Sequence, residues 1–116
     1  MATKPKQLKI STYLVRARKL IEDPDHWIKG AFAKRTPKGS SLDPERPDVT
    51  CFCAVGALRH VVAPHEAEQL LNMAVRDISD NSDWYVTQFN DRKSTTHADV
   101  LALYDAAIKR ARKQRI

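Results

Sequence analysis

The sequence lacks the long apolar runs and the leader that would place it in or across a membrane. Its longest near-continuous apolar run covers residues 51–62, whereas a membrane-spanning helix needs about 20 apolar residues. The start of the chain is polar and lysine-rich with no apolar segment behind it, so no secretory signal is recognised. We therefore expect a cytoplasmic protein with no membrane partner. The 116 residues contain no internal repeat, and their number predicts one domain, 1–116.

Cysteine is scarce as well, which restricts disulfide and metal chemistry. The two cysteines, Cys51 and Cys53, are separated by one residue, too close for an ordinary structural disulfide. Zinc sites usually take cysteine pairs two to four residues apart, and the positions of His60 and His65 match no common zinc-binding spacing. We expect neither a metal ion nor another cofactor.

Cys53 leaves one enzymatic interpretation open. A thiol at the start of a helix has a lowered pKa if it is exposed, and His60 lies on the same helical face seven residues later. At about 1.5 Å per residue the two are about 10 Å apart, too far for a direct hydrogen bond. A base would have to come from His26 or His97. We favour a buried structural cysteine and assign no catalytic residue.

The spacing of the apolar residues predicts a mainly α fold, a compact single domain of about four helices. The expected helices are residues 11–23, capped by Ser11 or Thr12, a central helix from near Cys53 to Val62, a third from Pro64 to Ile78, and a last helix opened by Thr96. Residues 84–89 are either a short helix capped by Ser82 or a strand. A short two-stranded β element is expected near residues 28–33 and 49–53.

Two sites in this plan carry specific expectations. Gly56 lies within the central helix, where glycine costs roughly 0.5–1 kcal/mol against alanine, so a neighbour should press against its bare backbone. Trp27 is our candidate for that neighbour. Thr96 and Asp99 are spaced like a capping box, with Asp in place of the usual Glu.

Residues 35–50 form the one long polar connection, in which several prolines and a glycine break regular structure. Loops of this length in compact domains are either mobile or functional. We expect a flexible surface loop.

The positive charge is concentrated at the two ends of the chain. Residues 1–19 hold six basic and no acidic side chains, and residues 108–116 hold five basic and again no acidic ones. If the first and last helices pack together, these residues form a patch able to contact nucleic-acid phosphates. The predicted nucleic-acid-binding residues are Arg16, Lys19, Lys109, Arg110, Arg112 and Lys113. No aromatic residue interleaves with them for base stacking, and a solvated or helix-dipole role is the alternative.

Four short motifs resemble a known pattern. They are Trp27-x-x-Gly30, Cys53-x-x-Gly56-Ala57-Leu58, Asn90-Asp91 and Thr96-x-x-Asp99-Val100. Over roughly residues 10–111 the chain resembles a small domain family of unknown function found in bacterial and phage proteins. That family has a tryptophan at Phe89 and a glutamate at Asp99. The resemblance implies a fold more than an activity, and Asn90-Asp91 is either a polar active-site pair or a structural hydrogen-bonding centre.

Together these observations predict a non-enzymatic binding protein. We expect a phage or mobile-element accessory factor that engages a nucleic acid or a host nucleoprotein. A small Cys-dependent enzyme is the first alternative, and a protein-only inhibitor or oligomer subunit is the second. The sequence does not indicate the oligomeric state.

Overall fold

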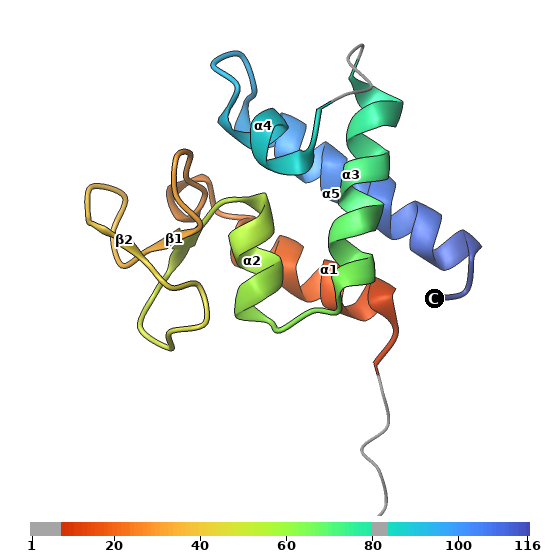
Figure 1. The fold of residues 1–116 in the computed structure, drawn as a ribbon, viewed down its shortest axis with the longest axis horizontal. Helices are drawn as coiled ribbons and strands as arrows, with labels where there is room; N and C mark the ends of the chain where they lie inside the picture. The colour runs from red at the N-terminus through yellow and green to blue at the C-terminus, as the bar shows by residue number, and fades with distance from the viewer. Residues whose placement is uncertain (1–7, 80–83) are drawn as a thin grey trace, which may run out of the picture.

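The computed structural model describes residues 8–79 and 84–116 and is mainly α-helical, as predicted (Figure 1). These described residues contain five α-helices, one more than expected, because residues 86–91 form a helix. A small three-stranded sheet takes the place of the expected strand pair. The elements in chain order are α1 (Ile10–Leu20), the 3-10 turn η1 (Pro24–His26), β1 (Ala33–Lys34), β2 (Ser41–Leu42), β3 (Cys51–Phe52), α2 (Ala54–His60), α3 (His65–Ile78), α4 (Val86–Asp91) and α5 (His97–Lys113).

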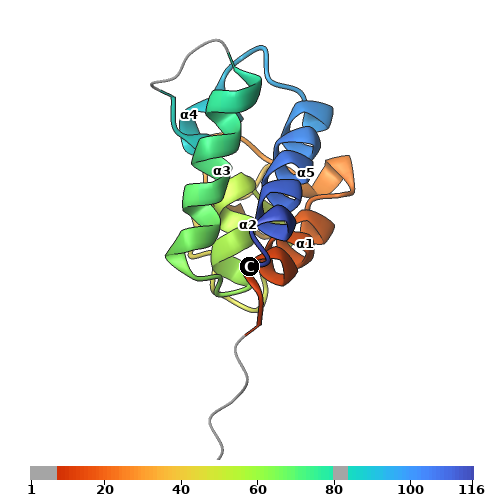
Figure 2. The same cartoon turned by 90° about the vertical axis from the view of Figure 1, so that its right-hand side faces the viewer.

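Helix α5 packs between α1 and α3 (Figure 2). Its buried stripe follows the helical period and includes Val100, Leu103, Tyr104 and Ala107, all fully inaccessible. Helices α1 and α5 run antiparallel, since the Ser11 N–H donates to the Ile116 carbonyl at one end and His97 Nε2 lies 2.6 Å from the Ile21 carbonyl at the other. The predicted pairing of the first and last helices is therefore present.

The start of α1 differs from the prediction. Ser11 and Thr12 lie inside the helix, and the N-cap residue is Lys9, whose side chain makes no capping bond. The Ser11 N–H is satisfied by the Ile116 carbonyl at 3.2 Å. A tertiary contact from the end of α5 thus does what a capping side chain would otherwise do, and the local sequence could not reveal it.

The sheet is antiparallel with the order β2-β1-β3. Ala33 pairs with Phe52 on one side, close to the predicted pairing, and with Leu42 on the other. The strand Ser41–Leu42 lies within the connection that was predicted to have no regular structure, so that part of the prediction is wrong. Each strand is two residues long, below the length at which period-two patterning can be recognised.

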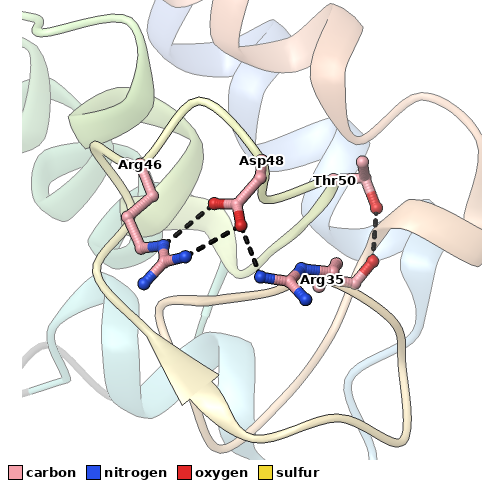
Figure 3. A network of polar contacts seen from close by, with 4 residues as sticks. All are labelled: Arg35, Arg46, Asp48 and Thr50. Carbon is pink, nitrogen blue, oxygen red and sulfur yellow. Dashed lines mark hydrogen bonds and ion pairs between the residues drawn. The ribbon is translucent and has the colours of Figure 1, made fainter.

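The 35–50 loop is held by a carboxylate between two guanidinium groups (Figure 3). Asp48 accepts hydrogen bonds from Arg46 at 2.9 and 2.8 Å and from Arg35 at 2.5 Å. The Thr50 hydroxyl donates to the Arg35 carbonyl at 2.8 Å. The hydrogen bonds from Arg46 and then Arg35 lower the pKa of Asp48 well below its usual range. This network connects the two ends of the loop.

The Asp48 network predicts a pH dependence of loop order. An aspartate whose pKa is depressed in the folded state stabilises that state above its unfolded pKa of about 3.9, and the contribution is lost as pH falls through the folded value. Backbone amide relaxation of residues 35–50 should therefore be unchanged from neutral pH to about pH 5. Asp48→Asn should raise loop mobility at neutral pH. Equal relaxation in wild type and Asp48→Asn would contradict this role.

The central helix α2 is buried along most of its length, as predicted. Residues 54–58 are all inaccessible or nearly so. The helix ends earlier than expected, at His60. Val62, to which the helix was predicted to extend, adopts φ +54° and is 68% exposed. The Ala63 N–H donates to the Leu58 carbonyl and the Val62 N–H to the Arg59 carbonyl, the two bonds of a Schellman C-cap, which requires a left-handed residue at position 62.

Gly56 does face a close neighbour, but that neighbour is backbone. A Cβ atom at this position would lie 1.8 Å from the Phe32 carbonyl oxygen. The same oxygen accepts the Cys53 N–H at 3.2 Å, so it is fixed to the start of α2. The expectation that Trp27 presses on Gly56 is wrong. The backbone of Phe32, just before β1, lies closer to Gly56 than any side chain does.

Side chains accept hydrogen bonds from backbone N–H groups at the N-terminal ends of α4 and α5. The Asp99 N–H donates to Thr96 Oγ1 at 3.2 Å and the Thr96 N–H to Asp99 Oδ2 at 2.8 Å, which confirms the predicted capping box. Residues 86–91 form a helix rather than a strand, and the Val86 N–H donates to Asn72 Oδ1 at 2.8 Å. The proposed cap Ser82 lies outside the described residues.

Within residues 8–79 and 84–116, no helix has the length and apolar character needed to cross a membrane.

Candidate functional site

A fully buried asparagine joins the sheet region to the helices. Asn90 Oδ1 accepts the Trp27 indole N–H at 2.7 Å and the Ala54 N–H at 3.0 Å. Its Nδ2 donates to the Ile28 carbonyl at 3.1 Å and to Asp91 Oδ1 at 3.0 Å. These four bonds use the hydrogen-bonding capacity of the amide. Asn90 therefore acts as the structural hydrogen-bonding centre that was one of the two predicted alternatives.

Next to Asn90 the chain forms a cavity of about 270 Å³. Its polar side chains are the Asp91 carboxylate, the Ser41 and Thr87 hydroxyls and the Cys53 thiol; the remaining lining residues are Gly30, Ala31 and Phe32. Asp91 Oδ1 also accepts the Gly30 N–H at 3.0 Å, where Gly30 has φ +79°. Three motif segments thus meet at one concave surface.

The Cys53 thiol has a structural role in this cavity. It is 4% exposed and its Sγ accepts the Gly56 N–H at 3.3 Å, which caps α2. Burial raises the pKa of the Cys53 thiol, and the nearby Asp91 carboxylate adds to that effect. A thiol in this state is a poor nucleophile at neutral pH.

The candidate bases lie elsewhere. His26 is exposed at the end of η1 and makes no hydrogen bond to Cys53. His60 Nδ1 is 2.8 Å from the Pro44 carbonyl, and its ring packs against Phe52. His97 Nε2 contacts the Ile21 carbonyl, and its ring packs against Trp27. Neither imidazole is hydrogen-bonded to Cys53, so the structure does not assemble a thiol and base from these residues. Cys51 is also buried, and its thiol donates to the Asp25 carbonyl at 3.6 Å. In the part of the chain that the structure describes, no three His, Cys, Asp or Glu side chains come together as a metal site.

The six predicted nucleic-acid-binding residues fall into two sets. Lys109, Arg110 and Lys113 line one groove of about 630 Å³ between α3 and α5, together with Asp77, Ala106 and Gln114. Arg16 and Lys19 are exposed on α1, and Arg112 is exposed on α5, but these three do not line the groove.

The two sets also differ in the acidic residues near them. Arg18 of α1 pairs with Asp105 of α5 at 2.8 Å and with Glu22 at 3.5 Å, so acidic side chains lie at the contact between the two helices. Arg110 instead pairs with Asp77 on α3. Arg16, Lys19, Lys109, Arg112 and Lys113 make no ion pair with any acidic side chain among the described residues. The six residues therefore do not form one patch: three line the groove, and Arg16, Lys19 and Arg112 are exposed outside it.

Comparison with known protein families identifies the family to which the chain belongs. A model described as a family of unknown function, DUF6197, matches residues 5–110. The chain belongs to this family. The match confirms the resemblance inferred from the motifs, and it names no activity. No match was found among curated proteins or among solved structures.

The motifs of that resemblance have physical roles in the structure. The Trp27 indole and Asn90 form one hydrogen bond, Gly30 and Asp91 another, and Gly56 admits the Phe32 carbonyl. Sequence reasoning missed Ser41, Thr87 and Asp77, because each reaches its site through a tertiary contact that no local spacing encodes. None of these three residues had a sequence signal that could have revealed it. Asn90 did have one, because it is a polar residue on the buried side of a short helix.

Proposed function

We propose that this protein is a non-enzymatic cytoplasmic binding protein that contacts nucleic-acid phosphates through the groove between α3 and α5. Its partner is a nucleic acid or a host nucleoprotein, and its setting is a phage or mobile element. The observation that carries the proposal is that Lys109, Arg110 and Lys113 line one concave surface. Adjacent cations on a groove wall attract a phosphate backbone whatever its base sequence.

The charge distribution supports this assignment over the enzymatic alternative. Residues 108–116 carry five basic and no acidic side chains, and Asp77 is the one acidic residue among those described that lines the groove. Cys53, in contrast, is buried, caps a helix and has a raised pKa. A Cys53→Ser variant that folds should therefore retain nucleic-acid binding.

The expected result is a steep salt dependence of binding. The affinity of the protein for a fluorescent duplex DNA should fall linearly with salt on a log–log plot, with a slope near −0.9 for each phosphate contact. In the variant with Lys109, Arg110 and Lys113 changed to Gln, the slope should become less negative by about 2.7, which is about 0.9 for each of the three contacts removed. Gln preserves helix propensity while it removes the charge. Fluorescence anisotropy from low to physiological salt measures both slopes.

A second variant with the same charge controls for net charge. Lys38, Arg76 and Lys93 are exposed and scattered over other parts of the surface, so their change to Gln should alter the slope much less. Asp77→Asn should strengthen binding because it releases Arg110, whereas Asp105→Asn, which releases Arg18 outside the groove, should do so less. No measurable affinity for DNA or RNA at low salt, or equal slopes for the two triple variants, would overturn the proposal. Association that does not change with salt would indicate a protein-only partner.

A further inference from the structure

The cavity beside Asn90 has a chemical character opposite to that of the basic groove. Among the residues that the structure describes, Asp91 is the one charged residue that lines it, and its other polar side chains are two hydroxyls and a thiol. The carboxylate is at the C-terminal residue of α4, where backbone carbonyls already make the potential negative and a cation is favoured. No lysine or arginine lines it.

The orientation of the Asp91 carboxylate is fixed on one side only. Oδ1 accepts two hydrogen bonds, from the Gly30 N–H and from Asn90 Nδ2, both at 3.0 Å. No hydrogen bond from a described residue reaches Oδ2. Because Asn90 is fully buried and bonded through both of its amide atoms, it holds the carboxylate in one orientation. One oxygen is therefore left available to a ligand.

We propose that this cavity binds a small protonated primary amine. An ammonium group can pair with a single carboxylate oxygen and donate its other N–H groups elsewhere, whereas a guanidinium fork is best matched by both carboxylate oxygens. The Ser41 and Thr87 hydroxyls supply further acceptors. A volume of about 270 Å³ lies just below the usual range for drug-sized ligands, so the ligand carries a short apolar stem that packs against Ala31 and Phe32.

Two cations near the cavity are engaged by other groups. The Lys29 ammonium donates to the Arg92 carbonyl at 2.7 Å. Arg59 packs its guanidinium on the Phe32 ring, 4.4 Å from the centroid, and lies 3.9 Å from Glu68. Its charge is directed to that carboxylate and to the ring face. Asp91 remains the charge that faces the cavity.

The test uses n-butylamine, protonated at neutral pH, with n-butanol and butylguanidine as matched probes. In a two-dimensional NMR titration of the full chain, butylamine should shift the Gly30 amide saturably, since that N–H is bonded to Asp91. The dissociation constant should be on the order of millimolar, as expected for a small ligand held by a partly exposed ion pair. Butanol should not reproduce the shift, and butylguanidine should bind more weakly.

Two variants separate binding from folding. Asp91→Asn keeps an oxygen for the Gly30 and Asn90 donors but removes the charge, and should weaken butylamine at least about tenfold, which is about 1.4 kcal/mol. Thr87→Leu keeps the charge but fills the cavity, and should weaken it similarly. Asp105→Asn is the control, because it removes a carboxylate on α5 that does not line the cavity, and it should bind butylamine like wild type. The assignment would be overturned by a butylamine shift that does not saturate or by an equal response to butanol. It would also be overturned if Asp91→Asn or Thr87→Leu bound butylamine as well as wild type, or if butylguanidine bound more tightly than butylamine. None of these outcomes bears on the nucleic-acid groove.

Discussion

Replacing Gly56 with Ala should unfold the domain or lower its free energy of unfolding by about 3 kcal/mol or more, the upper end of the range for overpacked cores. The added Cβ would lie 1.8 Å from the Phe32 carbonyl oxygen. That oxygen belongs to backbone bonded to Cys53, so it cannot rotate away as a flexible side chain would. Urea denaturation followed by circular dichroism measures the change.

Gly39→Ala is the matched control for Gly56→Ala. Its Cβ would lie 3.1 Å from the Thr36 hydroxyl and 3.3 Å from the Thr36 carbonyl oxygen, and a shift of a few tenths of an ångström in this turn relieves both contacts. The control should change stability by less than about 0.5 kcal/mol, as is usual for surface sites. A Gly56→Ala protein within about 1 kcal/mol of wild type would show that the Phe32 backbone does not press on α2 as described.

Asn90→Ala should also be strongly destabilising. The truncation leaves the Trp27 indole N–H and the Ala54 N–H without their acceptor, and each buried donor without a partner costs about 1–3 kcal/mol. The expected loss is therefore about 3 kcal/mol or more. It should be accompanied by an upfield change in the Trp27 indole proton resonance and by faster exchange of that proton.

Asn72 supplies the control for Asn90. Asn72 is only half-buried and makes one bond, to the Val86 N–H at the start of α4. Asn72→Ala should cost about 1 kcal/mol, the typical value of a helix cap. If Asn90→Ala proved no worse than Asn72→Ala, the hydrogen bonds of Asn90 would not hold the sheet region to the helices.

The helices were predictable from the sequence because their signals are local. The stripe on α5 and the Thr96–Asp99 capping box are encoded within a few residues, and both are present. The partner of Gly56 was not predictable, since a glycine in a helix signals close approach without saying what approaches. The cap of α1 and the strand Ser41–Leu42 also depend on contacts with distant residues.

The candidate sites divide in the same way. Charge counting found the basic residues of α5, because charge density is a property of the sequence itself. It could not show that the groove would form between α3 and α5, whereas Arg16 and Lys19 lie on α1. The cavity with Asp91 was beyond prediction, since Ser41, Thr87 and Cys53 come from three different elements.

The most direct measurement of the proposed function is an amide chemical-shift map with a short duplex DNA at low salt. The account predicts that the largest perturbations fall on Lys109, Arg110, Lys113 and the adjoining end of α3 near Asp77, the residues that meet at the groove. They should vanish as salt is raised, since the contacts are to phosphates. Perturbations centred on the Asp91 cavity or spread evenly over the surface would contradict it, as would an unchanged spectrum.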